Sequence, residues 1–214
     1  MKKTEIILKE GYPFIFVTGG IFLISLLFRF DTFWQILWFI VALFMVYFFL
    51  NPERIPDESG EDVIISPADG EIIEIIETKE KFFTNKDMLK ISIRLGLLDN
   101  HIQRAPIEGM LRENQYIHGE FLSLNSEKAS ELNEQNRTLF ENNKMSVVTN
   151  QIAGFITRRI VSWENEGQLK LAQRYGMIMF GSQVDLYIPK TTTLKVIVGE
   201  KVKAGESLIG LIKF

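Results

Sequence analysis

The hydrophobic pattern divides the chain into two parts of different character. Two long apolar runs lie near the N-terminus, at residues 12–28 and 33–50, and only RFDT separates them. A membrane-spanning helix needs roughly 20 apolar residues, with about 17 as the lower limit, so each run is just long enough. Aromatic residues lie near the ends of the runs, as at membrane interfaces. We therefore predict a membrane-anchoring helical hairpin over residues 1–50.

A secretory signal peptide and a pair of buried core helices are the alternatives to this hairpin. Lys2 and Lys3 precede the first run, but a second apolar run follows it and no small-residue cleavage site does. The second run contains one Gln and no charge, which exceeds the pattern of an ordinary core helix. Basic residues on both sides favour two cytoplasmic ends. The remaining chain is therefore expected at the cytoplasmic face of the cell membrane, whether the hairpin spans the bilayer or dips into one leaflet.

After residue 50 the pattern changes to short apolar or alternating runs separated by glycines. Residues 51–62 (NPERIPDESGED) are rich in Pro, Gly and acidic side chains, which is typical of a linker. Many short runs with turn signals between them indicate strands. Only residues 126–137 favour a helix, and a short one. The pattern predicts a mostly β (α+β) domain over residues 63–214.

The strongest strand signal, residues 176–189 (GMIMFGSQVDLYIP), is interrupted in its middle. Apolar residues come first and a clean alternation follows, but Gly181 and Ser182 stand between them. A glycine inside a strand weakens it and marks a bulge or a close approach of another group. The outer parts are predicted as one strand, and periodicity alone gives no reason for the interruption.

Composition removes several classes of chemistry. The 214 residues contain no cysteine, which excludes disulfides, thiol nucleophiles and cysteine metal sites. The net charge of −3 does not suggest the strongly basic face of a nucleic-acid-binding protein. The two histidines, His101 and His118, and the carboxylates Asp69, Asp99 and Asp185 lack the spacing of a metal motif such as H-E-x-x-H. No metal site and no nucleic-acid partner are predicted.

Three residues remain as candidates for chemistry. His101 follows the run 88–95 and can act as an acid or base near neutral pH, although it can equally be a structural histidine. Asp69 in SPADG can be an ordinary turn residue. Ser182 lacks the G-x-S-x-G pattern of a nucleophile elbow. The order Asp69, His101, Ser182 permits a triad, but a triad is recognised by geometry and the spacing does not decide.

Two phrases resemble the strand-and-turn segments of biotinyl and lipoyl carrier domains. They are SPADGEIIEI (66–75) and VGEKVKAGESLIGLI (198–212). The modifiable lysine of such carriers is absent. The resemblance therefore implies barrel or sandwich elements of that architecture, and not a carrier function.

Taken together, the motifs resemble the short bacterial and archaeal form of phosphatidylserine decarboxylase, a self-processing pyruvoyl enzyme. An N-terminal apolar hairpin is usual in that family. The order and spacing of seven phrases make the resemblance specific: SPADGEI (66–72), NHIQRAPIEG (100–109), YIHGEFLSL (116–124), NEQN (133–136), QIAGFITRRIV (151–161), GMIMFGSQVDLYIP (176–189) and VGEKVKAGESLIG (198–210).

This resemblance implies a maturation step at the Gly181-Ser182 peptide. Asp69 and His101 would polarise Ser182, whose hydroxyl attacks the Gly181 carbonyl and converts the amide to an ester. Elimination would then release a β chain of residues 1–181. The new N-terminus of the α chain, 182–214, would become a pyruvoyl group with loss of ammonia.

The implied activity is conversion of phosphatidylserine to phosphatidylethanolamine and CO2. The pyruvoyl cofactor, derived covalently from Ser182, would form a Schiff base with the substrate amine and take up the electrons left by CO2. His101 would donate the proton that quenches the carbanion. The implied partners are the membrane, its phospholipid substrate and the two cleaved chains as a heterodimer, with a higher oligomer left open.

The sequence departs from the family pattern beside the cleavage site. A basic residue before Phe-Gly-Ser and an arginine after it are replaced by Met179 and Gln183, and NERN has become NEQN with Gln135. Because Arg grips phosphates and carboxylates bidentately, these changes bear on the headgroup. Two alternatives remain, an archaetidylserine-type decarboxylase and a non-cleaving, membrane-tethered β-barrel adaptor. Candidates for holding the headgroup are Arg158, Arg159 and Arg174.

Overall fold

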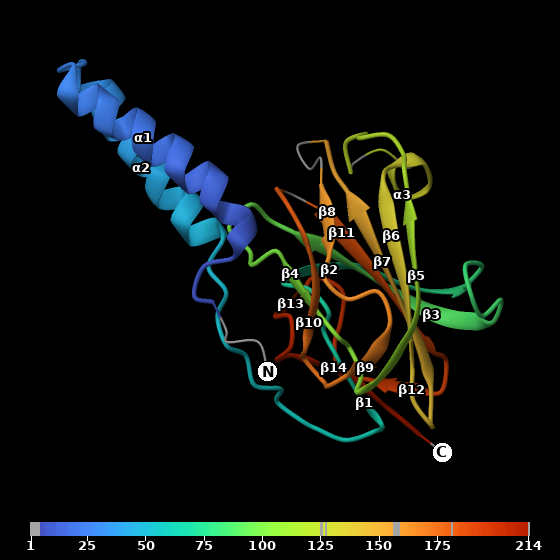
Figure 1. Cartoon of the computed structure of the whole chain (residues 1–214). Coiled ribbons are helices and arrows are strands. Elements are labelled where there is room, and N and C mark those ends of the chain that lie inside the picture. The colour runs from blue at the N-terminus through green and yellow to red at the C-terminus, as the bar shows by residue number, and fades with distance from the viewer. Residues whose placement is uncertain (1–4, 125, 127, 156–158, 181, 214) are drawn as a thin grey trace. The chain divides into compact units, whose positions relative to one another are not determined.

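A helical hairpin forms the N-terminal unit of the chain, Met1–Glu53. The computed structural model describes residues 5–124, 126, 128–155, 159–180 and 182–213. The short helix η1 (Lys9–Gly11) leads into α1 (Tyr12–Leu27), and α2 (Thr32–Phe48) follows (Figure 1). The Asp31 carboxylate caps α2 by accepting from the Phe33 amide at 2.9 Å. The predicted helical hairpin is confirmed.

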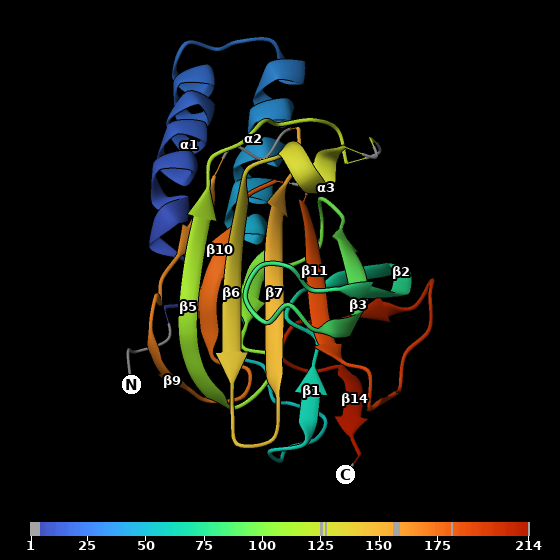
Figure 2. The ribbon, with the colours of Figure 1, turned by 90° about the vertical axis from the view of Figure 1, so that its right-hand side faces the viewer.

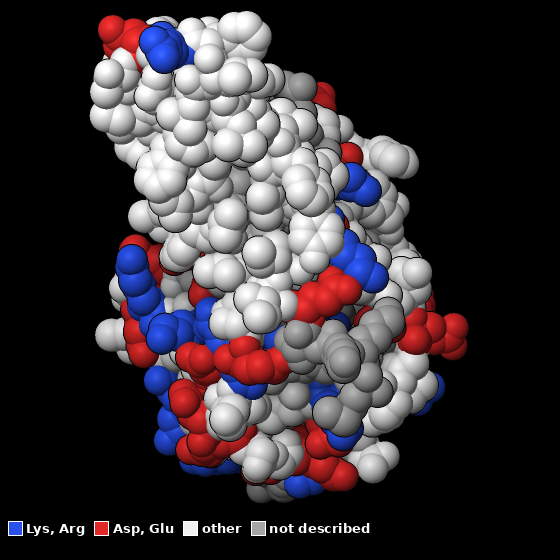
Figure 3. Space-filling model, turned by 60° about the vertical axis from the view of Figure 1, so that its left-hand side comes forward, with Lys and Arg blue, Asp and Glu red and all other residues white. Residues whose placement is uncertain are grey.

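The hairpin has the surface of a lipid-facing element. Between residues 11 and 50 the only charged side chains are Arg29 and Asp31, both in the turn between the helices. In Figure 3 its surface is accordingly white over most of its length. Residues Lys9–Leu27 form a helix that is long and apolar enough to cross a membrane, and α2 is a shorter apolar helix.

The second unit, Arg54–Phe214, is built almost wholly from strands, which confirms the mostly β prediction. Its largest sheet has eight strands in the order β13 (Lys201–Val202), β2 (Gly70–Lys79), β3 (Asp87–Leu95), β11 (Ser182–Pro189), β7 (Ser146–Ala153), β6 (Gln135–Glu141), β5 (Gly109–Ile117) and β9 (Gly167–Leu169). Two three-stranded sheets complete it: β4 (Ile102–Arg104), β10 (Arg174–Ile178) and β8 (Ile160–Ser162), then β1 (Val63–Ile65), β14 (Leu208–Ile212) and β12 (Thr192–Leu194).

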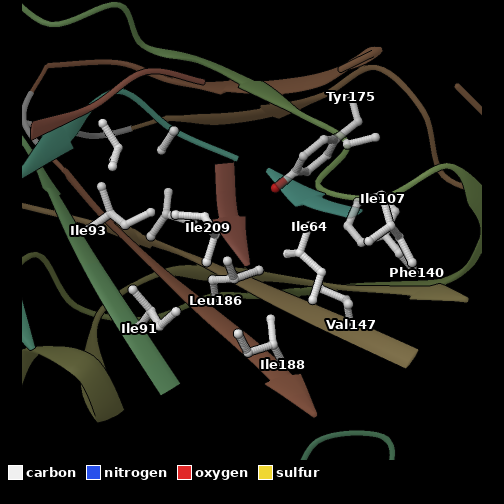
Figure 4. Close-up of a cluster of buried hydrophobic side chains, with 14 of the residues drawn as sticks. Ile64, Ile91, Ile93, Ile107, Phe140, Val147, Tyr175, Leu186, Ile188 and Ile209 are labelled. Carbon is white, nitrogen blue, oxygen red and sulfur yellow. The ribbon is translucent and has the colours of Figure 1, made fainter. Parts of the chain in front are cut away.

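Strand β11 lies in the middle of the large sheet, between β3 and β7 (Figure 2). Because side chains alternate along a strand, Val184, Leu186 and Ile188 all point to one face. There they join buried residues of the other sheets in a single core (Figure 4). Burying each such side chain stabilises the fold by about 1.5–3 kcal/mol, so the register of β11 is strongly fixed.

The structure corrects the prediction of one strand over residues 176–189. β10 ends at Ile178 and β11 begins at Ser182, and the two strands belong to different sheets. Between them Phe180 has a φ of 59°, a left-handed conformation that redirects the chain from one sheet to the other. The interruption seen in the sequence is therefore a crossing between sheets. Gly181 lies outside the described residues.

The helix expected over residues 126–137 is also shorter than predicted, since α3 covers only Ala129–Leu132. The Asn133 side chain ends it by donating to the carbonyl oxygens of Leu122 and Ala153, at 2.9 and 2.7 Å. Asn133 thereby turns the chain into strand β6, a competition with helix that is common for this residue type.

The two phrases that resemble carrier domains lie side by side. Lys201 and Val202 of β13 pair with Glu71 and Gly70 of β2 in an antiparallel ladder. The carboxyl end of the chain is therefore hydrogen-bonded to the segment that contains Asp69.

Candidate active site

Ser182 is the first residue of β11 and is fully buried. Its backbone pairs with Leu95 of β3 and with Ala153 of β7, so strands hold it on both sides. Among the described residues its Oγ has no hydrogen-bond partner. Leaving a buried hydroxyl unsatisfied costs about 1–3 kcal/mol, and native proteins keep such groups rarely. A hydroxyl held in this way is available for chemistry.

The residue that leads into this site carries backbone strain. Phe180 is a bulky residue in the left-handed region, which costs about 1–2 kcal/mol relative to ordinary conformations. Strain of this kind gathers at functional sites, where the surrounding structure maintains it. It lies directly before the predicted cleavage site.

His101 directly precedes β4 and is fully buried. Its Nδ1 is 2.7 Å from the backbone oxygen of Asp99. Because a carbonyl oxygen can only accept, Nδ1 carries the proton and Nε2 carries the basic lone pair. The backbone oxygen of His101 accepts from the Ile178 amide at 3.1 Å, which fixes it beside the strand that leads to Ser182.

The surroundings of His101 favour its neutral form. Burial lowers the pKa of the imidazole below its ordinary value of 6.5. The hydrogen bond to the Asp99 backbone, and the charges of Asp99 and Asp69, act in the opposite direction but do not offset burial. The ring is consequently a neutral base at pH 7, with Nε2 able to accept a proton.

The Asp69 carboxylate is held by groups other than the histidine. Oδ2 accepts from Nη2 of Arg54 at 2.9 Å, and Oδ1 accepts from the Ala204 amide at 2.7 Å. Asp69 acts on His101 through its charge. The carbonyl of Asp99, and not the carboxylate of Asp69, is thus the described acceptor that orients the imidazole.

Of the three predicted residues, Asp69 therefore acts on His101 through its charge, while the Ser182 hydroxyl is hydrogen-bonded to neither of them. Sequence reasoning missed Arg54, because it lies in the Pro- and acid-rich segment expected to be a linker. It also missed the role of Asp99, since a backbone carbonyl leaves no signature in the residue type. Arg54 belongs to the second unit and also contacts Glu206, with 3.5 Å between Nε and Oε1.

A chain of buried amides joins the strand after His101 to the central sheet. The Asn136 side chain donates to Oε1 of Gln151 at 2.8 Å, and Gln151 donates to Oε1 of Gln103 at 3.0 Å. These residues come from β6, β7 and β4, so the contacts cross from the large sheet to the small one. The chain of amides fixes β4, and therefore His101, relative to the strands that hold Ser182.

The positions that depart from the family pattern face the protein interior. Met179 is buried, and its amide donates to the Arg159 carbonyl at 3.2 Å. Gln183 is buried on the face of β11 opposite the core and donates to Oδ1 of Asp185 at 2.8 Å. Gln135 accepts from Arg137 at 3.0 Å. The side chains of Gln183 and Gln135 thus bond to neighbouring side chains of the large sheet, whereas the contact of Met179 is made by its backbone.

The three arginines considered for the headgroup differ in exposure. Arg159 is exposed, and Arg174 is half-buried in β10. Arg158 lies outside the described residues. Within the described parts of the chain, no three His, Asp or Glu side chains gather closely enough to hold a metal ion.

Fold and site together define a class: a mostly β unit with a buried serine and histidine, preceded by an apolar helical hairpin. The family model for phosphatidylserine decarboxylase matches residues 41–210. The chain belongs to this family, as its motifs indicated.

Curated relatives match along nearly the whole chain, and each carries the name phosphatidylserine decarboxylase proenzyme. The protein from Syntrophus aciditrophicus is 42% identical, with 98% of this chain and 99% of the relative covered. The protein from Carboxydothermus hydrogenoformans is 40% identical, with both chains covered completely. The one from Geotalea uraniireducens is 38% identical, and 98% of each chain is covered.

Proposed function

We propose that this protein is a membrane-bound phosphatidylserine decarboxylase that matures by cutting its own chain between Gly181 and Ser182. The observation that carries the proposal is the Ser182 hydroxyl, fully buried at the start of a central strand with no partner among the described residues. The word proenzyme in the relatives' names supports processing.

In the proposed maturation, Nε2 of His101 takes the proton of the Ser182 hydroxyl. The oxygen attacks the Gly181 carbonyl, the peptide C–N bond breaks, and an ester forms between the two residues. Loss of the Ser182 α-proton then eliminates the chain ending at Gly181 as a carboxylate. Hydrolysis of the dehydrated residue releases ammonia and leaves a pyruvoyl group on the α chain.

The pyruvoyl ketone would supply an acceptor for the electrons left when CO2 departs. The chain's own residues would position it and move protons. The start of β11 would keep the group in a site from which water is excluded, because Ser182 is fully buried there. Nε2 of His101 would return a proton to the substrate carbon.

The topology supports an α chain that stays bound after cleavage. Residues 182–214 contain β11, which pairs with β3 along Ser182–Pro189 and with β7 along Ser182–Tyr187. They also contain β14, which pairs with β1. The two cleaved chains would therefore remain a heterodimer, and the hairpin would keep the β chain at the cytoplasmic face of the cell membrane.

Activity toward phosphatidylserine is tested with purified protein in mixed micelles containing lipid labelled at the serine carboxyl. The proposal predicts release of labelled CO2 and formation of unlabelled phosphatidylethanolamine. Treatment of the enzyme with an amine and sodium cyanoborohydride should abolish both. An intact, trap-resistant chain with no CO2 release would instead support the adaptor alternative. Preference for the ether-lipid analogue over phosphatidylserine in the same assay would support the archaetidylserine alternative.

A further inference from the structure

Three large apolar side chains are exposed in loops beside the proposed active site. Leu97 and Leu98 follow strand β3 and are 51% and 65% exposed. Phe155 follows strand β7 and is 67% exposed. Single exposed apolar residues need no explanation, but a group of large ones beside a candidate active site does.

Strand register places these loops at the same end of the sheet as Ser182. Ser182 pairs with Leu95, the last residue of β3, and with Ala153, the last residue of β7. In Figure 2 the arrowheads of β3 and β7 point toward this same end. The two apolar loops therefore leave the sheet on either side of the residue from which the cofactor would form.

The chemistry of the loops is that of a surface meeting lipid. Where they leave the sheet, at residues 96–98 (GLL) and 154–155 (GF), the loops contain no charged residue, and Asp99 follows the first of these stretches. The Asp99 carboxylate accepts from the Gly96 amide at 2.7 Å, a contact that fixes the bend of the first loop. The exposed Arg159 follows the second loop at a short distance in sequence and suits an anionic headgroup.

We propose that Leu97, Leu98 and Phe155 form an apolar rim that inserts into the interface of a phospholipid bilayer and delivers the lipid headgroup to Ser182. This inference rests on the proposed function. A phospholipid keeps its acyl chains in the bilayer while its headgroup reacts, and Ser182 is fully buried. The end of the sheet that holds Ser182 must therefore approach the bilayer closely. Apolar side chains at the loop tips bind the bilayer interface because their apolar surface is removed from water.

The test compares one variant on two forms of the same substrate. The triple variant L97S/L98S/F155S is expected to cleave itself normally and to decarboxylate short-chain, monomeric phosphatidylserine at the wild-type rate. On phosphatidylserine in vesicles its activity is expected to fall at least about tenfold, because the three side chains no longer bury apolar surface in the bilayer. The hairpin stays intact in all variants, so binding to vesicles is not the readout.

Two further variants serve as controls. Ile76 is 40% exposed on β2 and is opposite Lys90, which in turn pairs with Tyr187 near the far end of β11. Ile76→Ser removes apolar surface away from the rim and should leave both activities unchanged. Phe155→Trp should keep full activity on vesicles, since tryptophan favours the membrane interface.

Full activity of the triple variant on vesicles would overturn the proposal, and so would an equal loss on both substrates, which indicates damage to the site itself. A change of oligomeric state in detergent, without a selective loss on vesicles, would assign the rim to contacts between copies of the chain. Failure of the proposed function is distinguishable, because the wild-type protein would then remain one chain on a denaturing gel.

Discussion

The tautomer of His101 follows from one hydrogen bond, and it explains how a buried histidine can serve as a base. The Asp99 carbonyl holds the proton on Nδ1, and burial lowers the imidazole pKa below 6.5. A lowered pKa means that the ring stays unprotonated as the pH falls through 6.5, and loses its basicity only at lower pH.

The rate of self-cleavage should accordingly show an acid limb that lies below pH 6.5. It can be measured by denaturing gel on freshly synthesised precursor over a series of buffers. His101→Ala should abolish cleavage at every pH. An acid limb centred above pH 6.5 would contradict the role of a buried, neutral His101.

Asp69 contributes charge, and its partner Arg54 holds that charge in place. Asp69→Asn removes a negative charge that raises the pKa of His101, so the imidazole becomes a weaker base. We expect maturation to slow severalfold, because a weaker base takes the Ser182 proton more slowly. The time course of precursor disappearance measures it.

Glu206→Gln is the matched control for this change. It removes the longer contact of Arg54, at 3.5 Å, and leaves the bond between Arg54 and Asp69 at 2.9 Å. Its maturation should match the wild-type rate. Asp69→Asn maturing as fast as Glu206→Gln would show that the charge of Asp69 has no part in cleavage.

At the scale of the elements, the amide side chains linked through Gln151 connect the large sheet to the small sheet that contains β4. Gln151→Leu would leave the Asn136 amide and the Gln103 carbonyl oxygen without their present partner. Each unsatisfied buried group costs about 1–3 kcal/mol, and we expect the melting temperature to fall by about 4 °C or more. Cleavage should slow as well, because His101 directly precedes β4.

Thermal unfolding and cleavage time courses test the role of Gln151 together. Gln115→Leu, at an exposed position of β5, is the control and should change neither. If the Gln151→Leu protein is destabilised but still cleaves itself at the wild-type rate, the linked amides stabilise the fold without positioning His101 for cleavage.

The elements themselves were only partly predictable from sequence. Period-two alternation identified the second half of 176–189 as a strand, since Val184, Leu186 and Ile188 alternate with polar residues. It could not reveal that Met177 and Ile178 pair with another sheet, because an apolar run looks the same in either place. The turn at Phe180 was hidden for a related reason, as phenylalanine carries no signal for a positive φ.

The candidate site was likewise only partly predictable: the sequence identified the reactive residues but not the groups that contact them. Residue types and the family resemblance singled out Asp69, His101 and Ser182. The partners that tune them came from long-range contacts that no local pattern encodes. Arg54 reaches Asp69 from a segment without periodicity, and Ala204 reaches it from near the other end of the chain.

At the scale of the whole molecule, the buried carboxylate of Asp185 carries a charge that opposes folding. Burial raises the pKa of Asp185 above its ordinary value of 3.8, while the hydrogen bond from Gln183 and the charge of Lys90 only partly oppose this. The folded state then binds more protons than the unfolded state, so stability falls as the pH rises from about 3.8 through the raised pKa.

Asp185→Asn should therefore raise the free energy of unfolding at pH 7, by about 1.4 kcal/mol for each pKa unit of the shift. Its amide oxygen can still accept from Gln183. The gain should shrink as the pH falls toward 3.8, the ordinary value. Denaturant unfolding at several pH values measures it, with the exposed Asp87→Asn as control. A gain that is the same at every pH would contradict this explanation.

Maturation and activity both depend on cleavage of the peptide bond between Gly181 and Ser182. Intact mass spectrometry of the purified protein under denaturing conditions tests it most directly, with Ser182→Ala measured alongside. We expect two chains from the wild type, 1–181 and 182–214, and a single full-length mass from Ser182→Ala. The smaller wild-type chain should be lighter by one ammonia than a chain that begins with serine. A full-length wild-type mass, or cleavage of Ser182→Ala at the same bond, would contradict it.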